Sequence, residues 1–161
     1  MPRIPRGERF NTLTHLAGAL LALGGALALV SQALQTKRTA VIVSFGIFGA
    51  ALVLLYTAST LYHASSGVWK ARLRTLDHCA IYLLITGTYA PFMLVTLAGP
   101  WGWTLMAAVS ALCVAGLWLE LRPSAKHSSR RWSLLLYLAM GWLGVAALQP
   151  LHQGLGSEGM A

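Results

Sequence analysis

The sequence contains little charge and very little acid. Only 10% of its 161 residues are charged, and four of these are acidic. A soluble domain is usually about a quarter charged, because its surface must interact with water. The scarcity of charge therefore argues against a soluble globular protein. Hydrophobic residues make up 57% of the chain and gather into long uninterrupted stretches, which indicates that lipid is the solvent.

Cysteine is also scarce. Cys79 and Cys113 are the two cysteines, and neither belongs to a C-x-x-C motif. Because both fall within or beside apolar stretches, we expect buried thiols that act as small hydrophobic groups, and no disulfide framework. A cleavable signal peptide is not expected either, since the first apolar stretch is too long and lacks a small-residue cleavage site.

Five apolar stretches are long enough to cross a membrane as helices. Each has about 20 residues, which at about 1.5 Å per residue spans a hydrocarbon layer of about 30 Å. The predicted spans are residues 12–34, 39–62, 76–98, 101–121 and 132–151. The sequence therefore predicts an all-α, polytopic transmembrane helix bundle, with residues 1–161 as a single domain. Pro91 should kink the third helix, because proline lacks a backbone donor.

The basic residues lie between these spans and predict their orientation. The net charge is +8, which in a soluble protein would suggest a nucleic-acid partner; here we expect none. Two cations, Lys37 and Arg38, lie on one side of the membrane. The ten on the other side are Arg3, Arg6, Arg9, Lys70, Arg72, Arg74, Arg122, Lys126, Arg130 and Arg131. The positive-inside rule makes this richer side cytoplasmic, and with it the N-terminus, in the cell inner membrane. Tryptophans near the span ends, such as Trp69 and Trp118, are typical of an aromatic belt.

Several polar residues map to the cytoplasmic ends of the first three spans. They are Glu8, Asn11, His15, Ser59, His63 and Asp77. The first three are spaced by three and four residues, so they share one helix face, and so do Ser59 and His63. Asp77 begins the third span after a connector of about a dozen residues, and a hairpin would bring it level with His63. Ionisable groups in membrane segments are costly and need an explanation.

Two explanations of this group remain open on the residues alone. His63 could bind zinc through a neutral imidazole while Asp77 orients or deprotonates a bound water. Alternatively, His63 could form a hydrogen bond to Asp77 or Ser59 that only joins two helices. His78 points about 100° away from Asp77 on a helix, so the two should not serve one site. Neither His127, in a basic loop, nor His152, at the opposite side, is expected to function.

Three motifs resemble those of the hemolysin III family, the bacterial branch of the progestin and adipoQ receptor superfamily. The first is Glu8-x-x-Asn11-x-x-Thr14-His15-x-x-Gly18, and the second is Ser59-x-x-x-His63. The third runs from Leu76-Asp77-His78 to Ile85-Thr86-Gly87-Thr88-Tyr89-Ala90-Pro91-Phe92. The resemblance covers essentially the whole chain. It implies a seven-helix membrane protein with a cytoplasmic N-terminus, so the five spans and the Gly-rich end suggest a C-terminally truncated chain.

The resemblance also implies a zinc site near the cytoplasmic side. In it His63 is a direct ligand, Asp77 approaches the metal through water, and Ser59 supports the site. The superfamily is similar to alkaline ceramidases, which implies metal-dependent hydrolysis of a lipid amide. The family's other two ligands form an H-x-x-x-H motif in the seventh helix, which this chain lacks, so the zinc site should be incomplete here.

Three functions follow as hypotheses. The first is a zinc-dependent, hydrolase-like membrane protein that acts on a lipid substrate when complete. The second is permeabilisation of target membranes, the activity in the family's name. The third is a sensor or regulator of the membrane state, in which the metal has a structural role. The apolar helices fit all three, and no amphipathic stripe for lining a pore is visible.

Overall fold

The computed structural model describes residues 5–122 and 129–159, and it is helical almost throughout. The elements are η1 (Arg6–Glu8), α1 (Arg9–Gln35), α2 (Thr39–Ala64), α3 (Gly67–Pro91), η2 (Phe92–Thr96), α4 (Pro100–Leu121), α5 (Ser129–Leu143), η3 (Gly144–Ala147) and α6 (Leu148–Gly159). No strand occurs in the described ranges. Five helical segments in them are long and apolar enough to cross a membrane, which confirms the predicted number of spans.

The third helix starts earlier than the sequence predicts. Its apolar stretch begins at Leu76, but α3 begins at Gly67, so a polar first part precedes the apolar one. The connector from α2 is then Ser65 and Ser66, not a dozen residues. Gly67 has a φ of 62°, a left-handed conformation that glycine adopts without steric cost, and this permits so short a turn. Hydrophobicity located the apolar part of the helix and missed its polar extension.

Two further details differ from the prediction. Pro91 ends α3, and a π-helical turn, η2, continues the chain, with the Leu97 amide donating to the Phe92 carbonyl at 2.8 Å. A π-helical turn thus follows Pro91, where the sequence predicts a kink. The second detail is the Gly-rich end of the chain, which lies beyond the last predicted span. It is helical in α6 as far as Gly159, with 160–161 outside the described residues.

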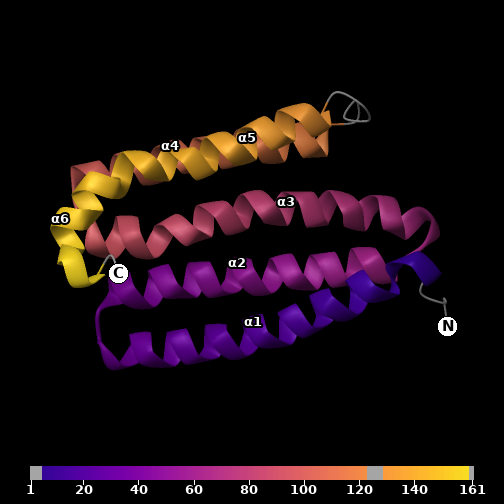
Figure 1. Cartoon of the computed structure of the whole chain (residues 1–161), viewed down its shortest axis with the longest axis horizontal. Coiled ribbons are helices and arrows are strands. Elements are labelled where there is room, and N and C mark those ends of the chain that lie inside the picture. Colours follow the sequence, from indigo (N-terminus) through magenta and orange to yellow (C-terminus); the bar gives the residue numbers. More distant parts are fainter. Residues whose placement is uncertain (1–4, 123–128, 160–161) are drawn as a thin grey trace.

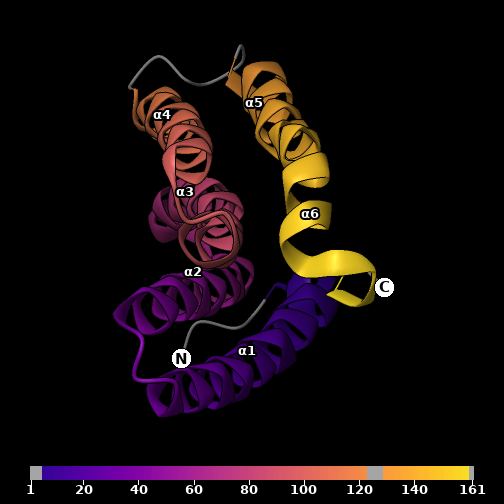
Figure 2. The same ribbon diagram turned by 90° about the vertical axis from the view of Figure 1, so that its left-hand side faces the viewer.

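The helices run antiparallel and side by side (Figure 1). The N-terminus and the α2–α3 turn lie at one end of the bundle, on the right in Figure 1, and the α1–α2 turn lies at the other. We call the first of these the basic end, because Arg9, Lys70, Arg72, Arg74, Arg122 and Arg131 all lie there. Arg3 and Lys126 lie outside the described residues. Seen along the bundle, α1 to α4 follow one another and α5 lies beside α3 and α4, while α6 bends away (Figure 2).

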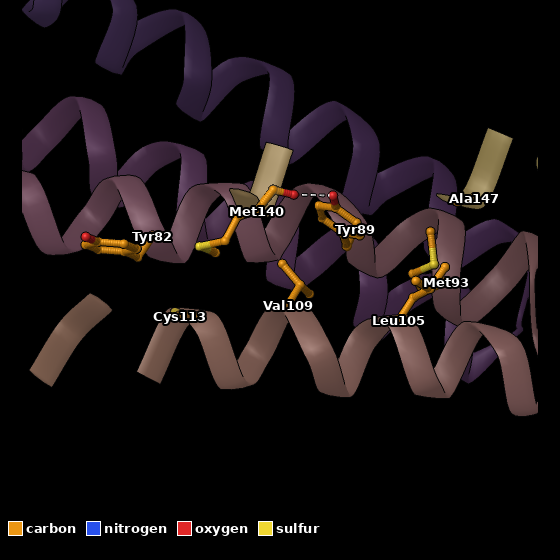
Figure 3. Close-up of a cluster of buried hydrophobic side chains, with 8 residues drawn as sticks. All are labelled: Tyr82, Tyr89, Met93, Leu105, Val109, Cys113, Met140 and Ala147. Carbon is orange, nitrogen blue, oxygen red and sulfur yellow. Dashed lines mark hydrogen bonds between the residues drawn. The ribbon is translucent and has the colours of Figure 1, made fainter. Parts of the chain in front are cut away.

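A core of buried side chains holds α3, α4 and α5 together. Figure 3 shows its members: Tyr82, Tyr89, Met93, Leu105, Val109, Cys113, Met140 and Ala147. The Tyr89 hydroxyl donates to the Met140 carbonyl at 2.5 Å, which joins α3 to the end of α5. Both cysteines are free and buried, as the sequence predicts. By contrast, the leucines of α1 are largely exposed, which suits a helix that faces lipid.

Candidate functional site

Glu8 joins the first three helices at the basic end. Its Oε2 lies 2.7 Å from His63 Nδ1, and its Oε1 lies 2.8 Å from Lys70 Nζ. These partners come from the last turn of α2 and the first turn of α3, so one carboxylate binds both sides of the α2–α3 connection. All three side chains are partly buried, which lessens screening of their charges by water.

The electrostatics of Glu8 follow from these two partners. Hydrogen bonds from Lys70 and then from His63 lower the pKa of the Glu8 carboxyl from 4.5 to about 2. Glu8 is therefore ionised at neutral pH and can only accept hydrogen bonds. It follows that His63 Nδ1 carries a hydrogen and donates it. In a neutral imidazole the lone pair then lies on Nε2, the other nitrogen of the ring.

Two further residues of the first motif, Asn11 and His15, lie beside Glu8 and His63. Asn11 donates from Nδ2 to Glu8 Oε2 at 3.3 Å, as their spacing of three residues on a helix permits. The His15 ring lies 5.1 Å from the His63 ring, measured between centroids. His15 Nδ1 is buried and has no hydrogen-bond partner among the described residues. The first two motifs therefore bring together two imidazoles, His15 and His63, and the Glu8 carboxylate. The sequence placed these residues on helix faces but did not show that the faces meet.

Ser59 and Asp77 are less closely connected to this group. Ser59 is buried on α2, one turn before His63, and takes part in no described hydrogen bond. Asp77 is partly buried, and no hydrogen bond or ion pair of the described residues involves it. Because α3 begins at Gly67, Asp77 lies seven residues beyond Lys70, about 10 Å further along the helix axis. A direct hydrogen bond from His63 to Asp77 or Ser59, one of the two open explanations, is absent from the described structure.

The residues fit one metal ligand and not a whole site. Ligating histidines usually donate their second ring hydrogen to a carboxylate, which orients the ring, and Glu8 and His63 have this arrangement. However, no three His, Cys, Asp or Glu side chains within residues 5–122 and 129–159 converge as a metal ion requires. The zinc roles of His63 and Asp77 therefore stay predictions.

A second polar cluster lies between α3, α4 and α5, and the sequence analysis missed it. Glu120 is nearly buried, its Oε1 accepts from the Ser133 hydroxyl at 2.5 Å, and its Oε2 lies 3.4 Å from His78 Nδ1. The Tyr137 hydroxyl donates to the His78 carbonyl at 3.1 Å. His78 thus has a partner that its position next to Asp77 did not suggest. The available signal was an acidic residue at the end of an otherwise apolar span.

Of the two remaining histidines, His152 is exposed on α6 and belongs to neither cluster, and His127 lies outside the described residues. Neither was expected to function, and the polar groups that meet come instead from η1, the first four helices and the start of α5.

Comparison with known proteins places the chain in a family. Residues 5–160 match the family described as Haemolysin-III related. Hemolysin-3 of Bacillus cereus is 38% identical over 165 residues, covering 100% of this chain and 73% of that protein. The Hemolysin-3 homolog of Bacillus subtilis (strain 168) is 38% identical over 158 residues, covering 96% of this chain and 72% of that protein. No solved structure matches. With five membrane-spanning helices and a family match over nearly its whole length, the chain belongs to the hemolysin III family of integral, multi-pass membrane proteins.

Proposed function

We propose that this chain carries part of a zinc-dependent hydrolase site that acts on a lipid amide. The observation that supports this is the hydrogen bond between His63 Nδ1 and Glu8, which fixes the ring and leaves Nε2 to face a metal. Bound zinc would lower the pKa of a coordinated water and so supply a nucleophile at neutral pH. The site lies at the basic end of the bundle, where we expect a lipid headgroup and its first linkage.

Each residue of the chain would have a distinct role in this site. His63 would be the direct ligand, and Glu8 would orient its ring. Asp77 would approach the metal through a water molecule, and Ser59 would support the site from one turn away on α2. The remaining ligands would come from outside these residues, in keeping with the H-x-x-x-H motif that the family resemblance implies for a seventh helix.

The test uses the product of the complete reading frame. We would sequence the coding DNA beyond the Ala161 codon and expect two further apolar segments, the second with H-x-x-x-H. In that protein, elemental analysis should find one zinc per chain, lost in His63→Ala and kept in the matched control His152→Ala. Zinc retained in His63→Ala would contradict the proposal, and so would a stop codon directly after Ala161.

Permeabilisation of membranes is a second candidate, supported by the hemolysin name of the two relatives. It predicts dye release from liposomes at a few protein copies per vesicle, with a lipid-matched control protein inert. A role as a sensor or regulator is separated from the hydrolase by removing zinc. If removing zinc unfolded the protein and no hydrolytic turnover depended on the metal, the sensor would be favoured.

The orientation is proposed on the distribution of cations. The basic end should face the cytoplasm across the inner membrane, since Lys37 and Arg38 are the cations of the opposite turn. Both native cysteines are buried, so a single introduced thiol can report on each side. A membrane-impermeant maleimide on intact cells should label Thr36→Cys and leave Ser66→Cys unlabelled; the reverse result would invert the orientation.

A further inference from the structure

The Glu120 cluster marks one depth on three helices. Glu120 on α4 contacts His78 of α3 and Ser133 of α5, so these three positions lie at a common level near the basic end. The rise of a helix then gives the depth of any neighbouring residue relative to this level. Moving toward the basic end means lower numbers on α3 and α5 and higher numbers on α4 (Figure 1).

Three arginines lie just beyond this level. Arg74 is four residues outward of His78, about 6 Å along the helix axis. Arg122 is two residues outward of Glu120, and Arg131 is two residues outward of Ser133, which is about 3 Å in each case. All three side chains are exposed. No carboxylate among the described residues pairs with any of them, in contrast to Lys70, whose charge is already matched by Glu8. We call these three residues the arginine band.

Tryptophans at the same depth identify the surroundings of the band. Trp118 and Trp132 lie within about 3 Å of the reference level along their helices, and both are exposed. Tryptophan concentrates where the hydrocarbon layer meets the headgroups. The Arg122 guanidinium lies over the Trp118 ring, 3.2 Å from its centroid, and this contact holds the charge beside the interface. We therefore expect the arginine band at the depth of lipid phosphates.

We propose that the arginine band binds anionic phospholipids of the membrane leaflet at the basic end. A guanidinium matches the geometry of a phosphate with two parallel hydrogen bonds, and it stays charged at every physiological pH. A phosphatidylglycerol headgroup leaves its phosphate charge uncompensated, whereas choline neutralises it, so anionic lipid should be preferred. This inference is independent of the proposed hydrolase, because it uses neither Glu8 nor His63.

A soluble anionic partner fits these observations less well. A polyanion such as nucleic acid, or an acidic protein, would have to reach arginines that lie within about 6 Å of a level marked by interfacial tryptophans. At that depth the neighbouring molecules are lipids. Cations belonging to a soluble interface would be expected to extend further from the membrane than the band does.

The experiment compares lipid preference in a triple variant and a matched control. The purified chain would be exchanged into mixed micelles with equimolar phosphatidylglycerol and phosphatidylcholine, and the retained lipids would be counted by native mass spectrometry. We expect the chain to retain phosphatidylglycerol preferentially. Each neutralised arginine should lower that preference about fivefold, so Arg74→Gln/Arg122→Gln/Arg131→Gln should lose it nearly completely. Lys37→Gln/Arg38→Gln, which removes charge from the opposite end, should retain it.

Three results would overturn the proposal. The first two are an unchanged lipid preference in the triple variant and an equal loss of preference in the control. The third is binding of inorganic phosphate to the arginine band in zwitterionic detergent without any lipid preference, which would assign the band to a soluble anion. Should the triple variant fail to fold by circular dichroism, Arg122→Gln alone must still lower the preference about fivefold.

Discussion

Glu8 and His63 are 55 residues apart in the sequence and meet through a hydrogen bond of 2.7 Å. The contact closes the end of the α1–α2 hairpin, and Lys70 extends it to α3. One carboxylate thereby fixes the ring orientation of the histidine that the proposed function depends on. Substituting Glu8 should affect both the stability of this end and the position of His63.

The pH dependence of this contact has a definite sign. The pKa of Glu8 is about 2 in the folded protein and about 4.5 when unperturbed, so the unfolded state binds more protons between these values. The stabilisation from Glu8 is therefore fully present above pH 4.5 and is lost as the pH falls toward 2. Carbon NMR of protein labelled in glutamate carboxyls should show one signal that titrates near pH 2. Glu8→Gln assigns that signal by removing it, and a Glu8 signal titrating near pH 4.5 would contradict the ion pairs.

Glu8→Gln should also loosen His63 without unfolding the bundle. A neutral amide loses the charge attraction to Lys70 and can present a donor to His63 Nδ1 in place of an acceptor. In the complete protein we expect weaker zinc binding by about 10- to 100-fold, the usual effect of removing a partner that orients a ligand. Thr14→Ala in the second turn of α1, whose hydroxyl bonds only to the backbone of its own helix, serves as the control. Equal zinc affinities in the two variants would remove Glu8 from the site.

Glu120→Ala should destabilise the contact between α4 and α5. The substitution leaves the Ser133 hydroxyl and the His78 ring without the carboxylate, and a hydrogen bond to a charged group contributes about 1.5–3 kcal/mol. We expect a loss of about 2 kcal/mol in the free energy of unfolding, measured by denaturant titration in micelles. Thr104→Ala, exposed on the same helix, should change it by less than about 0.5 kcal/mol. If Glu120→Ala lowered the free energy of unfolding by no more than Thr104→Ala does, the Glu120 cluster would add no stability.

Gly116 lets the ring of Tyr82 approach the backbone of α4. A Cβ at this position would collide with the ring, and Tyr82 is fully buried and cannot move away. Gly116→Ala should therefore cost about 1–3 kcal/mol, the usual range for overpacking. Gly46→Ala on α2, where the added Cβ meets nothing, should be neutral or stabilise the helix by about 0.5–1 kcal/mol. A neutral result for Gly116→Ala would indicate that α3 and α4 pack less tightly than described.

Tyr89→Phe tests the hydrogen bond at the end of α5. The hydroxyl bonds to the Met140 carbonyl, three residues before α5 ends and the 3₁₀ turn η3 begins. Its removal should cost about 1 kcal/mol, near the upper part of the range for polar contacts between membrane helices. Tyr56→Phe, whose hydroxyl has no described partner, is the control. Equal free energies of unfolding for Tyr89→Phe and Tyr56→Phe would show that the Met140 carbonyl accepts a hydrogen bond from another donor.

The spans, the basic end and part of the first polar cluster, namely Glu8, Asn11, His15 and His63, could be predicted from the sequence, because they depend on local composition and spacing. Apolar stretches of about 20 residues must become helices in lipid, where no other partner exists for the backbone. Helical spacing likewise places Asn11 beside Glu8 and Ser59 beside His63. The family resemblance added the zinc roles, which stay predictions.

The tertiary structure decided which polar groups meet. The early start of α3 at Gly67 brings Lys70, not Asp77, to Glu8 and His63, and a hydrophobicity pattern cannot reveal a helix that extends beyond the apolar layer. In the same way, Glu120 meets His78 and Ser133 only because α4 packs against both α3 and α5. Composition thus determined that this chain is a membrane helix bundle, while the rotation and register of each helix against its neighbours, set by side-chain packing, decided the partners.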